Sequence, residues 1–110
     1  MTGLSGKRVL VVGLARSGKA AAEALVERGA EVVGYDLDES LDVGRLLELG
    51  VEVRLGREEE TVLQGIDLVV KSPGVPGETL LVQGAREREI PVWSEIELGE
   101  IGRASCRERV

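Results

Sequence analysis

Short runs of apolar, β-branched residues alternate with amphipathic segments along most of the chain. The run VLVV at residues 9–12 is continuous and stops at Gly13, as expected for a strand buried on both faces of a parallel sheet. The segment 17–28 is rich in Ala, Leu and Glu, and with Ser17 placed to cap it and Gly29 to stop it, it predicts a helix. The same criteria predict strands at 31–35, 51–55, 66–71 and 90–93, helices at 41–49 and 79–88, and an acidic helical start at 94–97.

Strands that alternate with helices at this spacing form βαβ units with right-handed crossovers. We therefore predict an α/β fold: a Rossmann-like, three-layer domain whose mostly parallel sheet of about five strands carries helices on both faces. The acidic run at 58–60 is interpreted as a solvated face, on a loop or at a helix start.

Composition then narrows the function classes. The chain has 110 residues, enough for one small domain, and its one Cys and absence of His leave neither a disulfide framework nor a zinc or haem ligand set. No apolar run approaches the roughly 18 residues of a membrane-spanning helix, and no signal-peptide pattern opens the chain, so we expect a soluble, cytoplasmic protein with no membrane partner. A net charge of −6 with scattered Lys and Arg argues against nucleic acid as a partner.

The last ten residues, IGRASCRERV at 101–110, differ from the rest in composition. With Glu100 they resemble the translation of a short-read sequencing adapter, so we expect a native domain at 1–100 and a non-native tail at 101–110. The alternative is a genuine helix end with a basic last turn. Removing the tail takes away three Arg and one Glu, a net +2, which lowers the charge from −6 to −8 and removes the Cys.

Ligands of doubly wound sheets bind beyond the carboxyl ends of the strands, which makes the loops after the first, second and fourth predicted strands the candidate sites. The first, GLARSG at 13–18, has the outer glycines of a dinucleotide fingerprint, but Ala15 replaces the middle one. Amides near Ser17 and Gly18 are expected to bind phosphate oxygens, although the glycines also suit a plain strand-to-helix turn. GLARSGK matches a phosphate loop until Ala20, which cannot hold magnesium, so ATP hydrolysis is not expected here.

Asp36 directly follows the second predicted strand. An ionised carboxylate there accepts hydrogen bonds, which suits a ribose diol or a ring N–H. The alternative is that Asp36 caps the following turn, where Asp38 and Ser40 lie.

The third loop, SPGVPG, offers the Ser72 hydroxyl, and Gly74 in it lets a ring lie flat against the backbone. Four segments combine the three loops with a later motif: KRVLVVGLARSG at 7–18, YD at 35–36, DLVVKSPGVP at 67–76 and PVWSEIEL at 91–98. Taken together, these segments resemble the N-terminal domain of the Mur ligases, and most of all their D-glutamate-adding branch.

The resemblance implies a domain that holds the UDP end of UDP-MurNAc-L-Ala rather than NAD. It implies that the amides of Arg16 and Ser17 face the diphosphate, that Asp36 accepts the uracil N3–H beside Leu37, and that Gly74 lies against the uridine. The implied UDP-binding residues are Arg16, Ser17, Gly18, Asp36, Leu37, Ser72 and Gly74.

The resemblance also implies that catalysis lies elsewhere in the parent, a peptidoglycan-synthesis ligase that uses ATP, magnesium and D-glutamate in a further domain. We expect no catalytic residue and no metal site in this chain, which should be inactive alone and monomeric. Two alternatives stay open: an NAD-binding oxidoreductase domain that uses residues 13–18 and Asp36, and a regulatory nucleotide-binding module.

Overall fold

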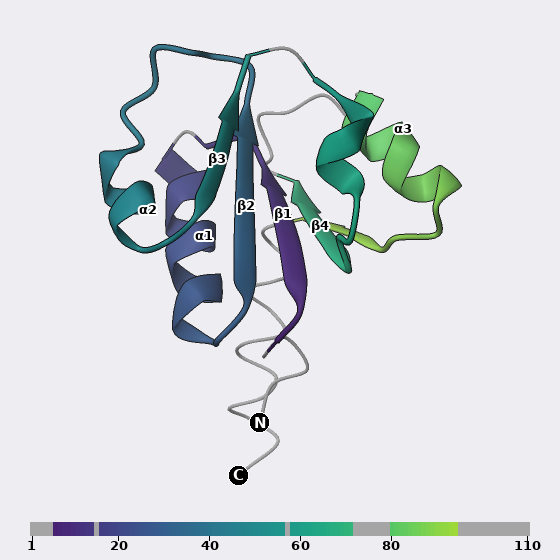
Figure 1. The fold of residues 1–110 in the computed structure, drawn as a ribbon, viewed down its shortest axis with the longest axis horizontal. Coiled ribbons are helices and arrows are strands. Elements are labelled where there is room, and N and C mark those ends of the chain that lie inside the picture. Colours follow the sequence, from purple (N-terminus) through teal and green to yellow (C-terminus); the bar gives the residue numbers. More distant parts are fainter. Residues whose placement is uncertain (1–5, 15, 57, 72–79, 95–110) are drawn as a thin grey trace, which may run out of the picture.

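The computed structural model describes residues 6–14, 16–56, 58–71 and 80–94. Within these ranges the chain folds into five strands and their connecting helices (Figure 1). In chain order the elements are β1 (Arg8–Val12), α1 (Arg16–Glu27), β2 (Glu31–Asp36), α2 (Gly44–Glu48), β3 (Glu52–Leu55), the short 3-10 helix η1 (Glu60–Leu63), β4 (Leu68–Lys71), α3 (Leu80–Glu87) and β5 (Val92–Ser94).

All strand pairs are parallel, and the sheet order is β3-β2-β1-β4-β5. The chain first builds outward from β1 through β2 to β3, and then returns to the other side of β1 with β4. The strand order therefore reverses between β1 and β4, which is the position where ligands of doubly wound folds bind. The predicted Rossmann-like, parallel, five-stranded sheet is confirmed.

The two faces of the sheet bury separate apolar layers, as alternate residues of a strand point to opposite faces. Val9 and Val11 of β1 pack with α1 and α2 on one face, whereas Leu10 and Val12 pack with η1 and α3 on the other. Figure 1 shows the two helical layers on opposite sides of the strands. Because both faces are covered, residues 9–12 are apolar throughout, and all four are at most 2% exposed.

Helix ends follow one pattern, in which a residue with positive φ stops the helix. Gly29 after α1 has φ +85°, and the amide of Ala30 donates to the Leu25 carbonyl at 3.1 Å. Gly50 ends α2 in the same way with φ +88°. Glu89, which ends α3, has φ 60° and is the non-glycine residue with positive φ among those described. The predicted stop at Gly29 is confirmed.

Several predicted boundaries are wrong. α1 begins at Arg16, so Ser17 lies inside its first turn and is not the capping residue. Ser94 belongs to β5 rather than to a helical start, and residues 95–97 lie outside the described ranges. The strand predicted from 66 begins at Leu68, because the chain turns just before it, where the Ile66 amide donates to the Leu63 carbonyl.

The helix predicted at 41–49 is shortened to Gly44–Glu48, because aspartates take the backbone amides before it. Asp38 Oδ1 accepts from the Ser40 amide at 2.9 Å, and Asp42 Oδ1 accepts from the Gly44 amide at 3.1 Å. Such local bonds compete with helical ones and favour turns.

Candidate functional site

The carboxyl ends of the strands form one edge of the sheet, where the candidate loops begin. Register aligns Val12 at the end of β1 with Tyr35 of β2 on one side and Lys71 of β4 on the other. The loops after β1 and β2 are therefore neighbours, as the sequence predicted. The loop after β4, which contains the predicted residues Ser72 and Gly74, lies outside the described ranges.

The glycine loop after β1 is held against the rest of the fold by close backbone approach. Gly13 has φ +95°, and its amide donates to the Tyr35 carbonyl at 2.7 Å. A Cβ at Gly18 would lie 1.7 Å from the Gly13 carbonyl oxygen, so only glycine fits there. The interpretation of both glycines as parts of a tight strand-to-helix turn is confirmed, and this turn brings the start of α1 to the sheet edge.

Leu14 anchors the same loop through its side chain. It is 0% exposed and belongs to the apolar layer beneath α1. It lies over Gly34 of β2, where an added Cβ would meet Leu14 Cδ2 at 2.9 Å. The lack of a side chain at position 34 thus provides the space that Leu14 fills.

Asp36 joins the first loop to the second. Its Oδ2 accepts a hydrogen bond from the Leu14 amide at 2.7 Å, and its Oδ1 accepts one from the Asp38 amide at 2.8 Å. The turn-capping interpretation of Asp36 is therefore confirmed, and the bond to Leu14 comes in addition to it. A carboxylate has about four lone-pair positions, so two acceptor positions remain for a ligand.

Leu37 follows Asp36 at the same edge and is 72% exposed. Its apolar side chain is therefore accessible to a ligand at this edge.

The first turn of α1, formed by Arg16, Ser17, Gly18 and Lys19, carries no acidic residue. By helix geometry its leading amides have no acceptor within the helix, and the helix dipole adds partial positive charge there. This end of α1 can therefore accept an anion.

A second polar group, missed from the sequence, links the β3–η1 loop to α3. Glu58 Oε2 accepts from the Leu81 amide at 2.8 Å, in the first turn of α3, so the carboxylate caps that helix. The Tyr35 hydroxyl donates to the Gly56 carbonyl nearby. Burial, then the charges of Glu58 and Asp36, raise the pKa of Tyr35 above its ordinary value of 10.0.

The interpretation of the acidic run at 58–60 as merely solvated is thus wrong for Glu58. Neither that capping bond nor the bond from Leu14 to Asp36 has a local signal, because the partners are 23 and 22 residues apart.

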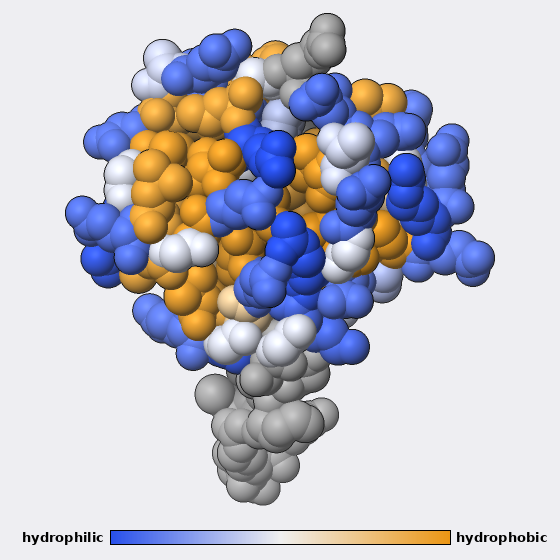
Figure 2. Space-filling view, in the orientation of Figure 1, coloured by the Kyte–Doolittle hydropathy of each residue, from blue (hydrophilic) through white to orange (hydrophobic). Residues whose placement is uncertain are grey.

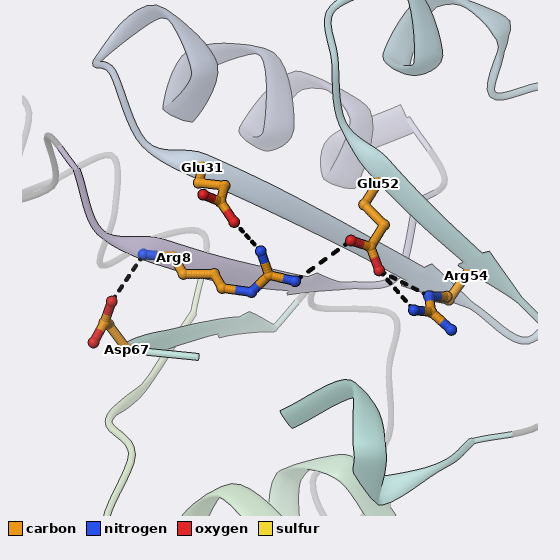
Figure 3. A network of polar contacts seen from close by, with 5 residues as sticks. All are labelled: Arg8, Glu31, Glu52, Arg54 and Asp67. Carbon is orange, nitrogen blue, oxygen red and sulfur yellow. Dashed lines mark hydrogen bonds and ion pairs between the residues drawn. The ribbon is translucent and has the colours of Figure 1, made fainter. Parts of the chain in front are cut away.

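A charged network begins at the opposite end of β1 and β2 and extends across to β3 (Figure 3). The Arg8 guanidinium donates to Glu31 and, at 3.4 Å, to Glu52, and Glu52 pairs with Arg54 at 2.8 Å. The Arg8 amide donates to Asp67 Oδ2 at 2.9 Å. In the orientation of Figure 1, Figure 2 shows polar residues across the middle of the visible face, between apolar areas.

The Arg54 guanidinium, with a smaller contribution from Arg8, holds the pKa of Glu52 below its ordinary value. Ion pairs this exposed contribute little to stability. The network runs from the start of β1 and β2 across to β3, where Arg54 is level in register with Tyr35.

Among the described residues, no group of three or more His, Cys, Asp or Glu side chains is arranged to hold a metal ion. None of the helices in the same ranges is both long and apolar enough to cross a membrane.

Comparison with protein families matches residues 7–94 to the family described as Mur ligase MurD-like, N-terminal domain. UDP-N-acetylmuramoylalanine–D-glutamate ligase of Shouchella clausii is 47% identical over 98 residues, covering 86% of this chain and 22% of that protein. The enzyme of the same name from Geobacillus kaustophilus is 45% identical over 96 residues, covering 84% of this chain and 21% of that protein. The chain thus spans about a fifth of the length of these relatives.

Solved structures share the fold at low sequence identity. UDP-N-acetylmuramate-alanine ligase of Thermotoga maritima matches with a TM-score of 0.78 at 20% identity, over 89% of this chain and 23% of that one. Shikimate dehydrogenase of Aquifex aeolicus matches with a TM-score of 0.59 at 19% identity, over 84% of this chain and 43% of that one. A fold shared by a ligase and a dehydrogenase does not by itself identify the ligand.

Proposed function

The chain belongs to the MurD-like N-terminal domain family of the Mur ligases, and on this premise we propose that it binds the uridine diphosphate end of UDP-MurNAc-L-Ala. The complete ligase would add D-glutamate to that substrate in peptidoglycan synthesis, with the nucleotide held by this domain. The observation that carries the proposal is that the start of α1 and the Asp36 carboxylate lie at one sheet edge, joined through Leu14.

The diphosphate belongs at the start of α1. The amides of Arg16, Ser17 and Gly18 are in the first helical turn, where each favourable interaction with an anion contributes about 0.3–1 kcal/mol when exposed. The net negative charge of the chain opposes anion binding, but a Debye length of about 8 Å leaves the nearest groups dominant. Lys19 in the same turn adds a positive charge.

The uracil belongs beside Asp36 and Leu37. The Asp36 carboxylate keeps acceptor positions after bonding two amides, and the ring N3–H is a donor of matching kind. The exposed Leu37 side chain offers apolar contact to the ring. Ser72 and Gly74 are proposed to complete the uridine contacts from the third loop.

ATP and magnesium belong to another part of the complete ligase in this proposal. Ala20 stands in α1 where a phosphate loop needs a hydroxyl for the metal, so the residues here do not fit that role. We therefore assign no step of the ligation reaction to this chain.

An amide-resonance titration of the ¹⁵N-labelled chain tests the proposal. UDP should shift the resonances of residues 13–18, Asp36 and Gly74, and NADH at the same concentration should shift them less. A response to NADH with none to UDP would instead support the oxidoreductase alternative and refute the ligase interpretation.

Two aspartate variants supply a matched comparison. Asp36→Ala should weaken UDP binding by about 1–3 kcal/mol, since a paired carboxylate is lost. Asp67→Ala removes another carboxylate that accepts a backbone amide, at the opposite end of the sheet, and should leave UDP affinity unchanged. Equal losses in both variants would indicate general destabilisation rather than a ligand contact.

A further inference from the structure

The Asp36 carboxylate has two structural bonds, and one of them reaches the loop that precedes the proposed phosphate site. Its Oδ2 atom accepts from the Leu14 amide at 2.7 Å, across 22 residues of sequence, in a part-buried position. Its Oδ1 atom accepts from the Asp38 amide at 2.8 Å and so fixes the carboxylate within its own turn. The bond from Asp38 therefore fixes the carboxylate, and the bond from Leu14 attaches the glycine loop to it.

The bond to Leu14 continues a backbone pairing. The Gly13 amide donates to the Tyr35 carbonyl. One residue further along each segment, the Leu14 amide donates to the Asp36 side chain. Only one residue separates Leu14 from Arg16, where α1 begins. The bond therefore anchors the chain two residues before the first amides of α1.

We propose that Asp36 is a positioning residue for the diphosphate, in addition to any contact with the base: through the Leu14 amide it holds the loop that aims the α1 amides at the phosphate oxygens. This inference rests on the proposed function. It assigns to one carboxylate an effect on a part of the ligand that carries the same sign of charge.

The two possible effects of Asp36 on the diphosphate have opposite signs. If the carboxylate acted only through its charge, removing it would strengthen diphosphate binding, because like charges repel. If it acts by holding the loop, removing it weakens diphosphate binding. The direction of the change therefore separates the two effects without any assumption about their size.

The experiment measures the dissociation constants of uridine and of UDP for the full 110-residue chain, by amide-resonance titration. The ratio of the two constants gives the affinity gained from the diphosphate, and contacts with the base cancel in it. In Asp36→Ala this ratio should fall about fivefold, which corresponds to one lost hydrogen bond. In Asp36→Asn, which keeps one acceptor oxygen, it should fall less.

Asp38→Ala is the matched control, because it removes the same charge two residues away. Asp38 accepts from the amide and the hydroxyl of Ser40 rather than from the first loop. Its diphosphate ratio should stay constant or rise. A ratio in Asp36→Ala that is unchanged or higher than in the wild type overturns the positioning role and leaves the proposed function intact.

Hydrogen exchange of the Leu14 amide provides a readout that needs no ligand. It should be about tenfold faster in Asp36→Ala than in the wild type, while the Leu10 amide in the centre of β1 exchanges at its original rate. An unchanged Leu14 rate overturns the inference whatever UDP does. A wild-type chain that shows no response to UDP refutes the proposed function, and the diphosphate role falls with it.

Discussion

Replacing Gly18 by alanine should destabilise the fold more than any other glycine-to-alanine change in its helices. The added Cβ would lie 1.7 Å from the Gly13 carbonyl oxygen and 2.7 Å from its carbon, whereas ordinary contacts are 3.4–4 Å. The start of α1 must therefore move from the end of β1 by about 1.5 Å, and interiors packed this densely resist such shifts. Overpacking typically costs about 1–3 kcal/mol, and a clash with backbone lies at the upper end.

Alanine also favours the helix by about 1 kcal/mol relative to glycine, so the expected net loss is about 2 kcal/mol. For a domain whose whole stability is about 5–15 kcal/mol, this is a large fraction. Urea unfolding followed by the fluorescence of Trp93, the single Trp of the chain, measures it. Trp93 is half-buried and packs against the apolar layer beneath α1, so its emission should report the transition.

Two further glycines make the comparison internal. Gly44, the first residue of α2, has only Asp42 Oδ1 at 3.4 Å from an added Cβ, so Gly44→Ala should be neutral or stabilising by up to about 1 kcal/mol. Gly84 in α3 would meet Leu63 Cδ1 at 2.7 Å, a side-chain end that can move, so its loss should be intermediate. The close approach would be refuted if the free energy of unfolding of Gly18→Ala lay within about 0.5 kcal/mol of the wild-type value. A difference of less than about 0.5 kcal/mol between Gly18→Ala and Gly44→Ala would refute it as well.

Three other predictions concern α3 and the tyrosine beside it. Glu89→Gly should stabilise the chain by about 1 kcal/mol, because φ is 60° at this position and glycine adopts positive φ without strain. Glu87→Gly, which lies inside the helix, should destabilise the chain, and thermal melts of both variants test the pair. Tyr35 should titrate above pH 10.0 in the folded chain, and since its raised pKa favours the neutral form, stability should be constant below that pH and fall above it. Tyrosinate absorbance of this single Tyr follows the titration, and a midpoint at or below 10.0 would contradict the assigned burial. Glu58→Gln should lower the Tyr35 pKa, and Glu58→Ala should cost about 1 kcal/mol through loss of the α3 cap, which denaturant unfolding would detect.

The sheet could be predicted from sequence because its signals are local. β1 and β4 are short apolar runs, β3 alternates charged and apolar residues, and the strong stop at Gly29 needs only the residues beside it. The helix predicted at 41–49 failed where local signals conflict, since the hydrophobic pattern favoured a helix and the side chains of Asp38 and Asp42 favoured turns. Here the side-chain hydrogen bonds prevailed, and only Gly44–Glu48 became helical.

The candidate site could be predicted only in part, because its loops were evident but their connections were not. The sequence indicated Asp36 as an acceptor, yet its bond to Leu14 depends on β1 and β2 being neighbours in register. Likewise, the capping of α3 by Glu58 depends on η1 and α3 sharing one face of the sheet. Such bonds form only when the fold brings distant segments together, so local sequence patterns do not predict them.

These long-range bonds also indicate how an acidic chain can offer a site to an anion. Two carboxylates at the carboxyl edge of the sheet already bond backbone amides: Asp36 bonds Leu14, and Glu58 bonds Leu81 at the start of α3. An anion at α3 would have to displace a carboxylate, whereas the first turn of α1 contains no acidic residue and includes Lys19. Of the starts of α1 and α3, that of α1 is therefore the one that favours phosphate. In the proposed function, the start of α1 is therefore the helix end that receives the diphosphate, and the start of α3 is already capped by Glu58.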